Sequence, residues 1–171
     1  MRTVVVGQPP RGFEDFLKRR RALGQDLFDE VWGGEYHVVP APHGRHGEVE
    51  LELAEILRPL GRRKGLSGRG PCNVGQPHDY RVPDQAYFAD RTPQTFHPTA
   101  AIVVEVVSPG DETWEKFSFY HEIGVRELLI VDPGKRSVEW FTRGEKKFVR
   151  SDHSALLGIS AAELASQIHW P

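Results

Sequence analysis

The sequence has a single cysteine, Cys72, among 171 residues, and it carries little net charge. One cysteine cannot form an intramolecular disulfide, so we expect the protein to work in a reducing compartment, the cytoplasm. The 22 Lys and Arg residues against 24 Asp and Glu give a formal net charge of −2, so the chain has no global positive field that would attract a polyanion. A nucleic-acid partner therefore has to be argued from local features.

Long apolar runs are also missing. No apolar stretch approaches the roughly 20 residues that a membrane helix needs, so we expect no membrane partner. The first residues, MRTVVVGQPPRGF, hold a run of valines that is too short for a signal-peptide core. Because the chain has the length of an ordinary domain and shows no internal repeat or low-complexity linker, we expect a single domain over residues 1–171.

Periodicity and turn residues predict secondary structure along most of the chain. We expect helices at 13–23, 47–60 (ended by Gly61), 113–123 (capped by Asp111) and 161–168. We expect strands at 28–32 and 35–39 (a hairpin around Gly33-Gly34), 82–88, 101–107, 127–131, and 137–142 with 147–149 (an edge hairpin). Helices that lie before and between the strands of a mixed sheet indicate an α/β or α+β fold.

Glu105 is the unexpected residue in the β-branched run AIVVEVV. Side chains alternate in a strand, so Glu105 shares one face with Val103 and Val107. An ionised carboxylate there costs several kcal/mol unless it is paired, bound to a metal or open to a cleft. An ion pair with Lys or Arg, or the exposed end of the strand, would also account for it.

A second carboxylate, Asp84, begins the preceding strand. If the two strands pair antiparallel with Phe88 opposite Ala101, Asp84 falls opposite Glu105. Directly opposed side chains on one face lie ~4.5–5.5 Å apart at Cβ. Two carboxylates at that distance repel, so we expect a cation between them. An oxygen-only ligand set favours Mg²⁺ or Mn²⁺ over Zn²⁺.

Lys116 is the candidate for a catalytic cation. It lies two turns into the third predicted helix, from which its side chain could lean back over the end of the strand. There it could orient a metal-bound water and stabilise charge that develops on a phosphoryl group; a solvated surface lysine is the alternative. Tyr120 shares its helical face at i+4, whereas Trp114, Phe117 and His121 form a stripe that we expect to pack in the core.

Other polar groups give less specific signals. His43 and His46 form an H-x-x-H pair beside Glu48, but no Cys or third His completes a zinc site. The glycine-rich segment 65–70 matches neither a P-loop nor a G-x-S-x-G motif and is expected to be a flexible loop. Cys72 has no context typical of a nucleophile, so we expect an inert thiol.

Basic residues cluster twice. One cluster spans Lys18–Arg21, and the other contains Arg58, Arg62, Arg63, Lys64 and Arg69. The second cluster follows the first long helix and precedes the strand of Asp84. It could line a DNA-facing rim, or it could simply solvate the surface.

Several motifs in the same order resemble the Uma-two family of restriction endonuclease-like proteins. They are V-P-D at 82–84, V-V-E-V-V-S-P at 103–109, W-E-K-F-x-F-Y at 114–120, G-V-x-E-L-L-I-V-D-P at 124–133 and H-V-V-P-A-P-H-G-R-H-G at 37–47. The likeness covers a core of about 28–142. It implies the fold of the PD-(D/E)XK nuclease superfamily, a central mixed β-sheet flanked by helices.

The resemblance also implies catalytic residues. Asp84 would be the aspartate of the P-D element and Glu105 the acid of the second element. In the superfamily a lysine stands two positions after that acid, but here the residue is Val107. Members of the Uma-two family place a lysine on the following helix, and Lys116 occupies that position.

The metal ligands implied by the resemblance are Asp84, Glu105 and the backbone carbonyl of Val106. Glu48 would be a further acid from the first long helix, although it also belongs to an i, i+4, i+7 stripe typical of a solvated face. His46 matches a family position near the metal cleft. The implied cofactor is Mg²⁺ or Mn²⁺, the implied partner is DNA, and homodimerisation is a habit of the family.

Two hypotheses follow. The first is a metal-dependent endonuclease that hydrolyses DNA phosphodiester bonds through Asp84, Glu105 and Lys116. The second is a catalytically inactive, dimeric nucleic-acid-binding or scaffold module on a nuclease-like fold, which Val107 and the slight acidity of the chain favour. A hydrolase of another ester class has no nucleophile motif and ranks last.

Overall fold

The computed structural model describes residues 3–5, 11–40, 44–108, 110 and 112–171. These residues form four α-helices: α1 (Phe13–Ala22), α2 (Gly44–Arg63), α3 (Lys116–Glu122) and α4 (Ala161–Gln167). No helix within those ranges has the length and apolar character needed to cross a membrane.

The strands of the described residues form two mixed six-stranded sheets and a short hairpin. The central sheet has the order β12 (Phe148–Ser151), β11 (Ser137–Arg143), β10 (Glu127–Asp132), β9 (Ile102–Val106), β7 (Gln85–Phe88) and β4 (Ser67–Arg69). The flanking sheet has the order β1 (Thr3–Val5), β3 (Glu35–Val38), β2 (Glu30–Trp32), β6 (Asp79–Arg81), β5 (Asn73–Gln76) and β8 (Phe96–His97). The hairpin joins β13 (His153–Ser154) to β14 (Ile159–Ser160).

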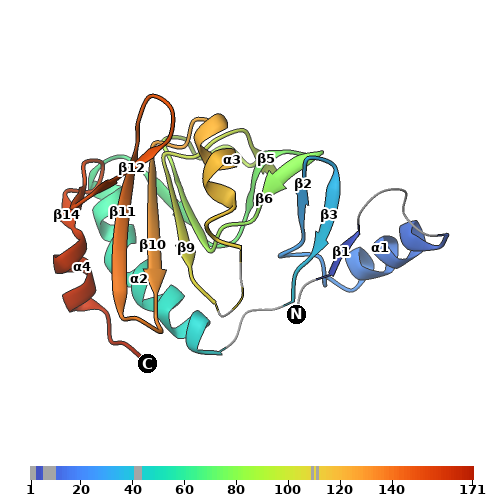
Figure 1. Ribbon diagram of the computed structural model, residues 1–171, viewed down its shortest axis with the longest axis horizontal. Helices are drawn as coiled ribbons and strands as arrows, with labels where there is room; N and C mark the ends of the chain where they lie inside the picture. Colours follow the sequence, from blue (N-terminus) through green and yellow to red (C-terminus); the bar gives the residue numbers. More distant parts are fainter. Residues whose placement is uncertain (1–2, 6–10, 41–43, 109, 111) are drawn as a thin grey trace.

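Both faces of the central sheet are covered. Leu53 of α2 and Leu164 of α4 pack with Val104 on one face, and Phe119 of α3 packs with Val103 on the other. Figure 1 shows α3 on the side of the flanking sheet, with α1 and α4 at opposite ends of the molecule. The predicted α/β class with a mixed sheet between helices is confirmed, and the flanking sheet adds a layer that the sequence did not reveal.

β9 is the central strand that the β-branched run predicted. It pairs parallel with β10 and antiparallel with β7, and all five of its residues are buried. The β7–β9 register aligns Gln85 with Val104 and Tyr87 with Ile102, which confirms the predicted pairing. Side chains alternate between the two cores as expected, so Glu105 lies on the α3 face.

The hairpin at Gly33-Gly34 is also confirmed. It joins β2 to β3, and both glycines have positive φ angles of 55° and 92°. Two successive residues in the left-handed region are the hallmark of a type I′ turn, in which glycine carries little steric cost. β2 pairs in turn with β6 through Val31 and Tyr80, which fixes the hairpin to the flanking sheet.

Helix α2 is longer than predicted. It begins at Gly44 and continues through Gly61 to Arg63, so the prediction that Gly61 ends the helix is wrong. A Cβ at Gly61 would lie 3.1 Å from the ring of Tyr87, so this glycine permits close packing of the helix on β7. Gly65, with a φ angle of 74°, provides the left-handed residue just beyond the helix.

Helix α3 is shorter than predicted. Residues 113–115 form a turn, and the helix begins at Lys116, which is therefore its first residue rather than two turns in. The predicted cap, Asp111, lies outside the described residues. The predicted core stripe holds for Phe117, which packs against Phe141, but it is wrong for Trp114, which is half exposed.

The prediction that the glycine-rich segment 65–70 is a flexible loop is wrong, because Ser67–Arg69 forms strand β4 of the central sheet. The chain from 62 to 81 is richer in strands than its glycine and proline content suggests. It contains β4, β5 and β6, and the loop that follows β7 contains β8. These strands have two to four residues each and include Gly, Asn and Asp, which have low β propensity. Their formation depends on pairing with distant strands, and local sequence cannot show that pairing.

Candidate functional site

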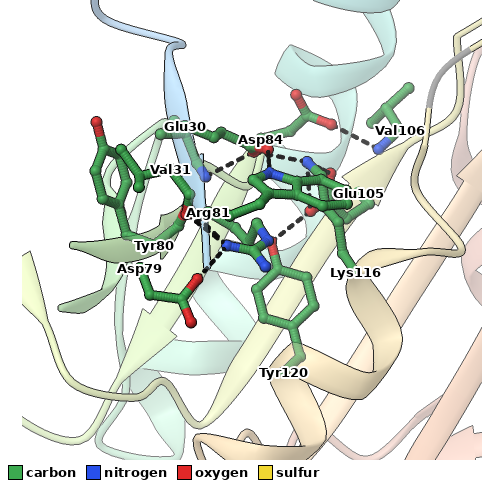
Figure 2. A network of polar contacts seen from close by, with 12 residues as sticks. Glu30, Val31, Asp79, Tyr80, Arg81, Asp84, Glu105, Val106, Lys116 and Tyr120 are labelled. Atoms are coloured by element: carbon green, nitrogen blue, oxygen red, sulfur yellow. Dashed lines mark hydrogen bonds and ion pairs between the residues drawn. The ribbon is translucent and has the colours of Figure 1, made fainter. Parts of the chain in front are cut away.

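Asp84 immediately precedes β7 and lies against the end of β9. Extending the register by one pair beyond Gln85 and Val104 places Asp84 opposite Glu105. Asp84 Oδ2 accepts a hydrogen bond of 2.6 Å from the backbone N–H of Val106. The two predicted acids therefore lie on adjacent strands, at one end of the network drawn in Figure 2.

Glu105 is buried, with 4% of its surface exposed, and two side chains of α3 contact its carboxylate. Tyr120 donates its O–H to Oε1 over 2.6 Å, and the ammonium of Lys116 lies 3.2 Å from the same oxygen. Burial raises the pKa of Glu105 above its ordinary value, and the positive charge of Lys116 offsets that rise only in part. The carboxylate is thus held by partners and is not free in a cleft.

The ammonium of Lys116 lies between two carboxylates that come from different sheets. Its Nζ is 2.9 Å from Oε1 of Glu30 on β2. Burial alone would lower the pKa of Lys116, but the charges of Glu105 and Glu30 raise it above its ordinary value, so the nitrogen keeps its proton. Glu30 also accepts hydrogen bonds from the backbone N–H of Val82 and the indole N–H of Trp32.

Arg81 fastens the flanking sheet to α3 beside this ion pair. Its guanidinium lies 4.3 Å from the ring centroid of Trp32 and 3.9 Å from that of Phe119. It also donates hydrogen bonds of 2.8 Å to the carbonyl of Val31 and 2.9 Å to the carboxylate of Asp79 (Figure 2). These contacts position β2, the strand that carries Glu30.

Helix α2 brings two further polar side chains, His46 and Glu50, to Asp84. Nε2 of His46 is 2.8 Å from Oδ1 of Asp84, and its Nδ1 is 2.9 Å from the hydroxyl oxygen of Ser108. One ligand atom from each of His46, Glu50 and Asp84 lies within 4.8 Å of the other two. Among the described residues, this is the one group of three His, Cys or acidic side chains close enough together to hold a metal ion.

Both side chains of α2 titrate in a field of negative charge. Burial raises the pKa of Glu50, and the charge of Asp84 raises it further. Burial alone would lower the pKa of His46, but its hydrogen bond to Asp84 and the charge of that carboxylate raise it overall. A cation bound here would neutralise part of this surplus negative charge.

The donor set fits a divalent cation. Carboxylate oxygens are typical ligands of Mg²⁺ and Mn²⁺, and an imidazole nitrogen is typical of transition metals. Mn²⁺ is the one of the two expected ions that suits both kinds of donor. The hydroxyl of Ser108 contacts the other nitrogen of His46, which is the arrangement that orients a metal-ligating histidine.

The predicted site residues fall into two groups. The structure brings Asp84, Glu105 and Lys116 together, and Lys116 reaches the acid from α3 although Val107 stands in the superfamily's lysine position. Glu48 points to the exposed side of α2, outside the metal group. The carbonyl of Val106 remains a prediction as a ligand.

Two other predictions concern neighbouring groups. His43 of the H-x-x-H pair lies outside the described residues. Burial raises the pKa of the Cys72 thiol to about 11, in keeping with the expectation of an inert cysteine.

Sequence reasoning missed Glu30 and Glu50. Glu50 stands at i+4 from His46 and beside the buried residue Val49, and that spacing could have revealed it. Glu30 gave no such signal, because its strand belongs to the other sheet. Tyr120 was placed on the face of Lys116, but its contact with Glu105 was not foreseen.

In this mixed sheet between helices, Asp84 and Glu105 lie opposite each other at adjacent strand ends, and Lys116 reaches Glu105 from α3. The chain belongs to the Uma2 (Uma-two) family, described as "Putative restriction endonuclease", whose model matches residues 13–165. A sequence comparison with curated proteins gives no match.

A solved structure from Anabaena variabilis ATCC 29413, described as a "putative nuclease belonging to DUF820", has the same fold. The two superpose with a TM-score of 0.66 over 82% of this chain and 90% of that chain, at 14% sequence identity. At that identity the likeness shows the fold alone.

Proposed function

We propose that the protein is a metal-dependent endonuclease that hydrolyses phosphodiester bonds of DNA. The observation that carries this proposal is the group of His46, Glu50 and Asp84 beside the ion pair of Lys116 and Glu105. Family membership supports a nuclease, and the donor set supports Mn²⁺ or Mg²⁺ as the cofactor.

The carboxylates of Glu50 and Asp84 and the imidazole of His46 would hold the ion, with Glu105 and the Val106 carbonyl as further expected ligands. When bound, a divalent cation polarises a phosphoryl oxygen and acidifies a coordinated water. Phosphoryl transfer depends chiefly on positioning and on electrostatic stabilisation. The residues of the chain have to supply both.

Lys116 supplies a fixed positive charge. Because its ammonium keeps its proton, its role is to stabilise negative charge on the phosphoryl group and not to accept a proton. Glu105 is a carboxylate whose pKa burial raises, and Tyr120 donates a hydrogen bond to it. Because Lys116 and Tyr120 both contact its carboxylate, the role of Glu105 is to position the Lys116 ammonium and not to accept a proton from water.

The alternative is a non-catalytic nucleic-acid-binding module. One observation favours it: the Glu105 carboxylate is occupied by Lys116 and Tyr120, and it lies outside the described group of metal-ligand atoms. Under this hypothesis the site would bind DNA without cleaving it. The two hypotheses differ in one measurable outcome, metal-dependent strand cleavage.

The test is cleavage of supercoiled plasmid DNA by the purified chain with Mn²⁺, with Mg²⁺ and with EDTA. We expect nicking or linearisation with either metal and none with EDTA. Asp84→Asn removes a ligand charge and should lower the rate at least about a hundredfold. The exposed acid Asp152 provides a control, and Asp152→Asn should cleave at the wild-type rate. Full activity of folded Asp84→Asn would overturn the proposed site.

A further inference from the structure

At the edge of the central sheet, a pocket of about 310 Å³ is lined by Arg58, Arg62, Ser67, Gly68, Arg69 and Arg91. We propose that this arginine pocket binds the phosphate backbone of the nucleic acid, at a position remote from the bond that is cleaved. The nature of the ligand rests on the proposed function. The argument that this pocket binds an anion uses residues that are not part of the proposed active site.

The arginines come from three separate segments. Arg58 and Arg62 are one turn apart on α2, Arg69 belongs to β4, and Arg91 follows β7. Cations are favoured in the last turn of a helix, and among the arginines of the pocket this accounts for Arg62 alone. Because β4 is an edge strand, the pocket lies at the rim of the sheet.

Among the described residues, no carboxylate forms an ion pair with an arginine of the pocket. Arg20, Arg21, Arg81 and Arg150 form ion pairs with carboxylates, and none of these four lines the pocket. Four guanidinium groups without a carboxylate partner repel one another. Within a chain of net charge −2, such a concentration of positive charge favours an anionic ligand.

Arg69 is held in place by neutral groups. Its Nη2 donates a hydrogen bond of 2.9 Å to the carbonyl of Thr92, its Nη1 is 2.5 Å from Nε2 of His97, and its guanidinium lies 4.9 Å from the ring centroid of Phe88. Burial and the charge of Arg69 lower the pKa of His97, although the charge of Asp90 opposes them, and a lowered pKa favours the neutral imidazole that can accept this hydrogen bond. A guanidinium oriented in this way keeps its charge for a phosphate and loses little entropy on binding.

The spacing along α2 relates the pocket to the metal group. At ~1.5 Å of rise per residue, Arg58 lies roughly 18 Å and Arg62 roughly 24 Å from His46 along the helix axis. Since duplex DNA advances ~3.4 Å per base pair, that separation corresponds to about five to seven base pairs. A backbone that follows α2 could reach both places, whereas a single free phosphate could not.

The test measures binding of a fluorescein-labelled 30-base-pair DNA duplex by anisotropy in EDTA, where metal-dependent cleavage cannot occur. The variant is Arg58→Gln with Arg62→Gln, and the matched control is Arg63→Gln with Lys64→Gln. The control removes the same number of positive charges near the C-terminal end of α2, but neither Arg63 nor Lys64 lines the pocket. All four side chains are exposed, and thermal unfolding checks that both proteins remain folded.

Each lost phosphate contact reduces the slope of log K against the logarithm of the salt concentration by about one. We expect the pocket variant to bind at least about tenfold more weakly near 0.1 M salt, with a salt slope smaller by about two, and the control to change by less than about twofold. Equal weakening in both variants would overturn the proposal, because it would show a diffuse charge effect. A wild-type protein that does not bind the duplex would overturn it as well.

Calorimetric titration with inorganic pyrophosphate separates a backbone phosphate from a free one. Pyrophosphate binding that depends on Arg58 and Arg62, with duplex affinity unchanged in the variant, would assign the pocket to a small anion and contradict the proposal. Arginine-dependent duplex binding without any cleavage in Mn²⁺ would instead overturn the proposed nuclease and leave the pocket intact.

Discussion

Lys116 is an ammonium group that two carboxylates from different sheets share, and all three side chains are nearly excluded from water. Bringing such charges out of water is costly, and removing one partner costs more than the pair contributes, because it leaves a buried charge uncompensated. Replacing Lys116 should therefore destabilise the fold. The size of this destabilisation should depend on pH, because Glu105 can take up a proton when its cationic partner is missing.

We predict that Lys116→Met destabilises the protein by about 3–5 kcal/mol at pH 8 and by clearly less at pH 5. Without Lys116, the positive charge that lowers the pKa of Glu105 is gone, and burial raises that pKa further. An acid with a higher pKa in the folded state binds more protons folded than unfolded. The stability that protonated Glu105 contributes to the folded variant is fully present below the unfolded pKa of about 4.3. It is lost as the pH rises through the pKa of Glu105 in the folded state.

Urea unfolding at pH 5 and pH 8 measures this difference. Lys135→Met is the control, since Lys135 forms an exposed ion pair with Asp132 and its loss should matter little at either pH. An equal destabilisation of Lys116→Met at both pH values would contradict a buried, charge-coupled Glu105.

At the residue scale, the sequence allows prediction of the charged site residues that lie on elements adjacent in the chain. Asp84 and Glu105 could be paired because strand register follows simple arithmetic, and Lys116 could be placed because its helix follows the strand. Glu30 could not be found, since its contact with Lys116 depends on the pairing of β2 with β6 about fifty residues further along the chain. No local periodicity encodes such a contact.

Helix α2 is the element that connects the proposed metal group to the arginine pocket. Its buried face, which includes Val49, Leu53 and Leu57, packs on the central sheet and fixes His46 and Glu50 at one end and Arg58 and Arg62 at the other. The apolar spacing predicted this face correctly. The ends of the helix were misjudged, because Gly61 serves close packing on Tyr87 and does not terminate the helix.

We predict that Leu53→Ala lowers the free energy of unfolding by about 2–5 kcal/mol, because it leaves a cavity beneath α2. Leu51 lies on the same helix but is 69% exposed, so Leu51→Ala should change stability by no more than about 0.5 kcal/mol. Urea unfolding of both variants measures the difference. Similar stabilities would mean that this face of α2 does not carry the packing described here.

At the scale of the whole molecule, the proposed site lies where two sheets and two helices meet. The central sheet supplies Glu105, the flanking sheet supplies Glu30, and α3 supplies Lys116 (Figure 2). Helix α2 supplies His46 and Glu50. The central sheet could be predicted from its long apolar strands. The flanking sheet could not, because its short polar strands are stable only through their partners.

Positive and negative charges are unevenly distributed along α2. The formal charge of −2 hides an acidic group of His46, Glu50 and Asp84 at one end of α2 and a basic pocket at the other. A cation at the first and a phosphate backbone at the second would together neutralise both. The absence of a global basic field is therefore compatible with binding of DNA at particular places.

The most direct test of the central claim compares two glutamates that lie two residues apart on α2. Glu50→Gln removes a carboxylate from the proposed metal group, and Glu48→Gln removes one from the exposed face of the same helix. In plasmid cleavage with Mn²⁺, we predict that Glu50→Gln loses at least about nine-tenths of the wild-type rate and that Glu48→Gln retains it. Equal rates in the two variants, or greater loss in Glu48→Gln, would contradict the proposed metal site.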